Sequence, residues 1–74
     1  MFKINGEEWN VVAVSPSDPA LLRSDGGYTI GVCDDNLKCI YIAIGLPDNL
    51  FKKVLCHEIT HAAMFSYDVV LSLS

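Results

Sequence analysis

The chain has 74 residues, 51% of them apolar, and a formal net charge of −4 at pH 7. A chain this short buries only about 60% of the surface that it exposes when unfolded, so we expect a single domain over residues 1–74. Its five Lys and Arg residues are scattered, which argues against a nucleic-acid partner. The sequence shows no run of 18 apolar residues and no charged, apolar leader, so we expect no membrane partner and a cytoplasmic location.

Strand-like and turn-like segments alternate along the first half of the chain. β-Branched and aromatic residues predict a first strand over Glu8 to Val14, and Ser15 to Ser24 suits a short helical turn. After the break at Asp25-Gly26-Gly27, alternating residues predict a second strand over Tyr28 to Cys33 and a third over Lys38 to Ile44. We expect these last two strands to pair as a hairpin.

The second half of the chain predicts one long helix. Pro47 and Asp48 suit a helix start, and neither Gly nor Pro follows before Ser74. Apolar residues recur at helical spacing and predict one broad buried face, made of Leu50, Phe51, Val54, Leu55, Ile59, Ala62, Phe65 and Val69. We therefore expect an α+β fold in which a small antiparallel sheet of two or three strands packs on one long C-terminal helix.

The segment His57-Glu58-Ile59-Thr60-His61 lies in the middle of that helix. Side chains four residues apart on a helix are neighbours, with Cβ atoms about 5–6 Å apart, so both imidazoles can bind one zinc ion. Glu58 is turned about 100° from His57, which places its carboxylate beside the metal rather than on it. The carboxylate can then take a proton from a zinc-bound water that attacks a peptide carbonyl, and pass it to the departing amine. Glu58 also falls within the apolar stripe, where a nearby cation makes a carboxylate tolerable.

At these residues the chain resembles the HExxH zincin metallopeptidases of the gluzincin type. The stretch from Val54 to Ala62 is similar to the active-site helix of small phage- and mobile-element-associated members grouped with the ImmA/IrrE proteins. The resemblance implies a zinc-dependent hydrolase of phage or bacterial origin, with His57 and His61 as zinc ligands and Glu58 as general base and acid. It also implies that a peptide or protein substrate docks by strand addition along the third strand, Lys38 to Ile44.

A catalytic zinc site needs a third protein ligand and an open position for water. In the gluzincins this ligand is a later Glu, but no Glu follows Glu58, and Met64 and Tyr67 stand where the metzincin pattern has Gly and His. We therefore expect either a chain truncated before its third ligand, with impaired or absent catalysis, or a ligand from elsewhere. The candidates are Asp68, Asp34, Asp35, a cysteine and a second chain.

A structural zinc site in a non-catalytic protein is the alternative. Cys33 and Cys39 flank the predicted hairpin turn, and His57 and His61 follow on the helix, which is the order of a zinc site with two cysteines and two histidines. The spacings differ from the usual ones, however, and Glu58 has no role in such a site.

Two further expectations concern the cysteines and the C-terminus. Three cysteines do not suit a disulfide framework, and the simplest interpretation of Cys33, Cys39 and Cys56 is that they are small buried hydrophobic residues. The apolar residues that end the chain predict homo-oligomerisation through the C-terminal helix.

Overall fold

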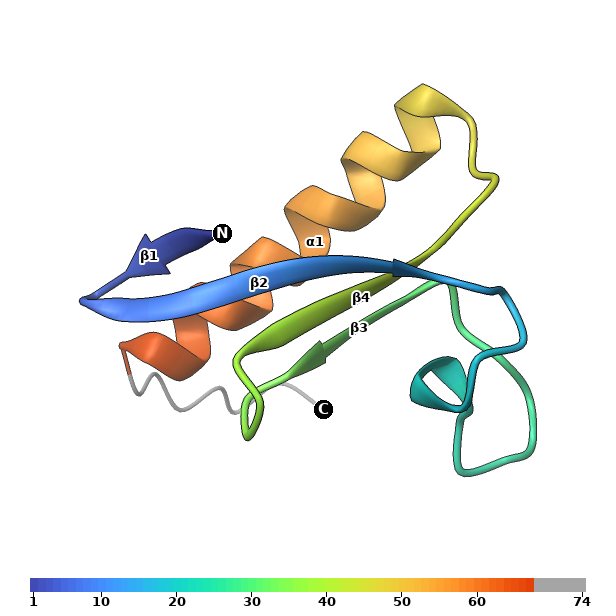
Figure 1. Ribbon diagram of the computed structural model, residues 1–74, viewed down its shortest axis with the longest axis horizontal. Helices are drawn as coiled ribbons and strands as arrows, with labels where there is room; N and C mark the ends of the chain where they lie inside the picture. Colours follow the sequence, from blue (N-terminus) through green and yellow to red (C-terminus); the bar gives the residue numbers. More distant parts are fainter. Residues whose placement is uncertain (68–74) are drawn as a thin grey trace.

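A computed structural model describes residues 1–67 of the chain. The elements follow one another as β1 (Phe2–Ile4), β2 (Glu7–Val14), the short 3₁₀ helix η1 (Pro19–Leu21), β3 (Gly31–Asp34), β4 (Cys39–Ala43) and α1 (Asp48–Ser66). The four strands form one sheet in the order β1-β2-β4-β3, and α1 lies along one face of it (Figure 1). The structure confirms an α+β fold with a C-terminal helix, but the sheet is larger than expected and is mixed rather than antiparallel. Within the described residues, no helix is both long enough and apolar enough to cross a bilayer.

The strand that the sequence interpretation missed is β1, which pairs antiparallel with the start of β2. Asn5 and Gly6 connect the two strands with φ angles of 51° and 80°, the left-handed combination that a two-residue type I′ hairpin turn requires. Asn-Gly is a strong hairpin signal, but a strand of three residues is too short for alternation to reveal it.

The pairing of β2 with β4 is parallel, and Val11 lies level with Ile40. The expected hairpin of β3 and β4 is confirmed. Because β4 therefore lies between β2 and β3, the expectation that Lys38 to Ile44 is an edge strand is wrong. The edge strand of this part of the sheet is β3, which begins at Gly31 rather than at Tyr28.

The core lies between the sheet and α1, where Trp9, Ile40, Ile42 and Ala62 are completely buried. Four further residues of the predicted helix face pack against this cluster, namely Phe51, Val54, Leu55 and Ile59. Leu50 and Phe65 are exposed instead, so the buried face of α1 is narrower than predicted. Near the end of α1, the indole N–H of Trp9 donates a 2.8 Å hydrogen bond to the buried hydroxyl of Ser66, which ties the helix to β2.

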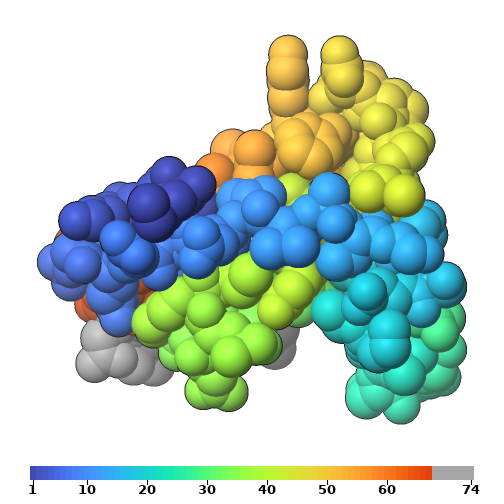
Figure 2. Space-filling view, in the orientation of Figure 1, coloured from blue at the N-terminus to red at the C-terminus, as the bar shows by residue number. Residues whose placement is uncertain are grey.

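Both faces of β4 are covered. Cys39 and Ala43 are buried together with Ile40 and Ile42, and η1 contacts β4 and β3 with the fully buried Leu21. Burial on both faces is typical of strands with a parallel neighbour. Figure 2 shows β2 crossing the visible face of the molecule, with α1 on one side of it and the turn between β3 and β4 on the other.

Candidate metal and peptide site

The two histidines of the HExxH segment converge at the middle of α1. His57 Nε2 and His61 Nε2 are 3.0 Å apart, and the two rings lie nearly perpendicular at 79°. Two nitrogens that bind one tetrahedral zinc ion at about 2.0–2.1 Å lie about 3.3 Å apart. Small rotations of the rings would therefore let both nitrogens reach one ion, so the pair fits a shared metal.

Glu58 lies on the side of the helix that faces β3. Its side chain is more than nine-tenths buried, with 8% exposed. It nevertheless makes no hydrogen bond or ion pair with any of residues 1–67. No fully buried side-chain oxygen of the described residues lacks a hydrogen-bond partner, so the carboxylate oxygens keep access to solvent through the cavity that Glu58 lines. A cation beside the carboxylate would stabilise its negative charge.

A cavity of about 270 Å³ opens beside Glu58, between the start of β3 and the first half of α1. One wall comes from the chain around the start of β3 and the other from the helix. The lining residues are Thr29, Ile30, Gly31, Lys53, Val54, His57 and Glu58. The cavity thus brings the general base expected from the sequence and one of the two expected ligands to the edge of the sheet, while His61 lies outside its lining.

Gly31 permits the close approach of β3 to Glu58. A Cβ atom at this position would lie 2.5 Å from Val54 Cγ1 and 3.3 Å from both Cγ and Oε2 of Glu58. Only a residue without a side chain therefore fits here unless the helix shifts. The sequence alone predicts no role for Gly31, although a lone glycine in a strand is a recognised sign of close backbone approach.

The edge of β3 beside Glu58 offers main-chain groups for strand pairing. The N–H of Ala43 donates to the carbonyl of Ile30 at 3.0 Å, and alternate residues of an antiparallel pair bond to the neighbouring strand. The main-chain groups of Gly31 and Cys33 therefore point away from β4, and the carbonyl of Gly31 accepts a 3.3 Å hydrogen bond from the hydroxyl of Thr29. Within residues 1–67, no other strand covers that edge.

The structure does not assemble the alternative site of two cysteines and two histidines. In the β3–β4 register Cys33 lies opposite Ile40, whose side chain is in the core beneath α1. Successive residues of a strand face opposite sides of a sheet, so Cys39 lies on the face away from the helix. His57 and Cys39 are thus separated by the sheet.

The three cysteines have different surroundings. Cys39 is buried as expected, Cys33 is half-buried, and Cys56 is exposed on α1, so the expectation of burial is wrong for Cys56. Burial, and next the negative charge of Glu58, raise the pKa of the Cys33 thiol to about 11. Cys33 therefore remains protonated at neutral pH and lies within electrostatic reach of Glu58.

The candidate third ligands of the β3–β4 turn have other partners. Asp34 Oδ1 accepts backbone N–H groups from Asn36 and Leu37 at 2.9 and 3.1 Å, and Asp35 forms an ion pair with Lys38 at 2.5 Å. Within residues 1–67, no three side chains of His, Cys, Asp or Glu come together as a metal site. The remaining candidate, Asp68, lies outside the described residues, as do the terminal apolar residues expected to mediate association.

Comparisons with known proteins found no match to this chain among protein-family models, curated proteins or solved structures. The resemblance to the HExxH zincins therefore stays a prediction, and the site is interpreted from its own geometry.

Proposed function

We propose that this protein is a zinc-dependent, HExxH-type peptidase whose metal is held by His57 and His61. One observation carries the proposal: Glu58 and His57 line the same cavity, and His57 Nε2 lies 3.0 Å from His61 Nε2 on the next turn of the helix. A cation bound to the two histidines would stabilise the negative charge of the Glu58 carboxylate. The structural-site alternative gives Glu58 no such reason to be there.

Each residue of the site has a role in peptide hydrolysis. Zinc, when bound, lowers the pKa of a coordinated water to about 7 and polarises a carbonyl. Glu58 takes the proton of the attacking water and delivers it to the amine nitrogen that departs. His57 and His61 would supply two of the three protein ligands that a catalytic zinc needs, and no third ligand lies beside them within residues 1–67.

The substrate is held as an added strand on the open edge of β3. The main-chain groups of Gly31 and Cys33 would pair with an extended peptide there, which places a peptide bond next to Glu58. The docking strand is thus β3 rather than the Lys38 to Ile44 strand expected from the resemblance, because β4 already has a neighbour on each side.

Metal analysis of protein purified without chelator tests the metal site. We expect stoichiometric zinc in the natural chain, its loss in His57→Ala and its retention in Glu58→Gln, because Glu58 is not a ligand. A Cys33→Ser/Cys39→Ser variant should keep its zinc. Absence of zinc from the natural chain, or unchanged zinc in His57→Ala, would refute the metal site, and loss of zinc from the cysteine variant would favour the structural alternative.

Turnover of a peptide library tests the reaction. We expect zinc-dependent cleavage that Glu58→Gln abolishes, with circular dichroism to show that the variant is folded. No cleavage by the natural chain, or cleavage that survives Glu58→Gln, would refute the proposed chemistry.

A further inference from the structure

One positive charge at the cavity forms no ion pair within residues 1–67. Arg23 pairs with Asp25 at 2.8 Å, and Lys38 pairs with Asp35 and with Glu7. Lys53 lines the cavity but forms no ion pair with any of residues 1–67. Glu58 is the acid that shares this cavity with Lys53, and the two side chains form no direct ion pair.

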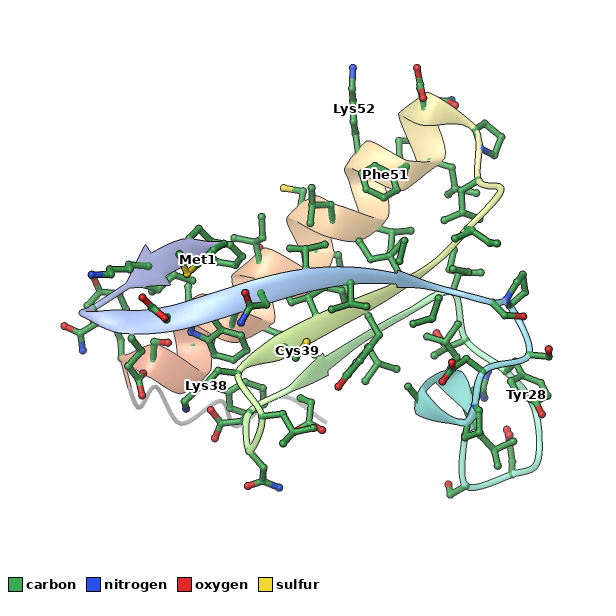
Figure 3. The ribbon with its side chains drawn as sticks, in the orientation of Figure 1. Met1, Tyr28, Lys38, Cys39, Phe51 and Lys52 are labelled. Carbon is green, nitrogen blue, oxygen red and sulfur yellow. The ribbon has the colours of Figure 1, made fainter. Side chains whose placement is uncertain are left out.

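Lys53 lies on the same row of α1 as the two histidines. It precedes His57 by one turn, a spacing at which Cβ atoms lie about 5–6 Å apart. Its neighbour Lys52 is turned about 100° around the helix and extends away from the rest of the molecule (Figure 3). The cavity wall thus includes Lys53 but not Lys52. A charge change at Lys52 therefore serves as a control for the same change at Lys53, because it alters the net charge without altering the cavity.

We propose that Lys53 is a specificity-determining residue that selects peptides with an acidic side chain beside the bond at Glu58. The inference rests on the proposed function, because it assigns the substrate class of the same cavity. Ile30 and Val54 form apolar parts of the wall, and a less polar surrounding strengthens the attraction between an ammonium group and a substrate carboxylate. The charge of Glu58 repels that carboxylate, so the acidic side chain belongs at the end of the cavity nearer the start of α1. A basic side chain at that position would be rejected by Lys53.

Peptide binding tests this inference separately from turnover. Three pools of short fluorescent peptides carry Glu, Gln or Lys at one fixed central position, with random residues around it. Their affinities are measured by fluorescence anisotropy with zinc-loaded Glu58→Gln protein, which should bind the peptides without cleaving them. We expect the Glu pool to bind about fivefold more tightly than the Gln pool, the range of a partly exposed ion pair. Adding Lys53→Glu should reverse the order of the Glu and Lys pools, whereas the matched control Lys52→Glu, with the same change of net charge, should preserve it.

Equal binding of the Glu and Gln pools, an equal effect of the two charge reversals, or no binding of any pool would overturn the inference. The proposed function is decided by other measurements, namely zinc content and cleavage by the natural chain. Zinc-dependent cleavage without a preference for acidic peptides would refute only the role of Lys53 and would leave the proposed peptidase function standing. Binding that prefers acidic peptides without any cleavage would refute the peptidase alone.

Discussion

Replacing Gly31 by Ala tests whether the contact between β3 and α1 sets the position of Glu58. The new Cβ would lie 2.5 Å from Val54 Cγ1, whereas carbon atoms in contact are normally about 3.5–4.0 Å apart. Val54 is β-branched and stiff at χ1, so strand and helix must separate by about 1 Å. Such overpacking destabilises the folded state by about 1–3 kcal/mol. The lower conformational entropy of Ala in the unfolded chain stabilises the fold by about 0.4–1 kcal/mol and offsets part of that loss. We expect Gly31→Ala to lower the free energy of unfolding by about 1–2 kcal/mol.

Urea unfolding followed by the fluorescence of Trp9 measures this effect, because Trp9 is the only tryptophan and is fully buried. The matched control is Gly27→Ala, whose Cβ would meet only the Asp25 carboxylate, at 3.2 Å. Val54→Ala should rescue Gly31→Ala, with a coupling free energy of about 1 kcal/mol between the two sites. The reasoning is refuted if Gly31→Ala is as stable as the natural chain, or if Val54→Ala costs the same in both backgrounds.

Two further predictions follow from single contacts. Ser66→Ala leaves the buried indole N–H of Trp9 without its acceptor and should lower the free energy of unfolding by about 1–3 kcal/mol; in urea unfolding, a loss no larger than that of the exposed control Ser17→Ala would contradict it. Because the thiolate is the reactive form and the pKa of Cys33 is about 11, alkylation of Cys33 should be slow at pH 8 and accelerate toward pH 11, whereas the exposed Cys56 should react first. Glu58→Gln should lower the pKa of Cys33 only in part, since burial is the larger cause of its rise. Alkylation rates measured by mass spectrometry would refute this if they were equal for Cys33 and Cys56 at pH 8, or if the rate of Cys33 were unaffected by Glu58→Gln.

The features that the sequence by itself determined are those set by residues close together in the chain. The spacing of His57 and His61 fixes their convergence wherever the segment is helical, and the helix itself follows from an uninterrupted periodic pattern. The β3–β4 hairpin is likewise local, because its two strands are joined by a short turn that Asp34 caps. The burial of Glu58 follows from its place on the apolar stripe.

Only the tertiary structure decided which strand is the edge and what faces Glu58. The parallel pairing of β2 with β4 joins segments separated by about two-fifths of the chain, and no local pattern specifies a partner at that distance. That pairing makes β4 internal and leaves β3 exposed beside the helix, where Gly31 meets Glu58. The same packing buries Ser66 against Trp9, exposes Phe65, and puts Lys53 but not Lys52 on the cavity wall. Helical periodicity assigns a side chain to a face, but which neighbour covers that face depends on how the helix crosses the sheet.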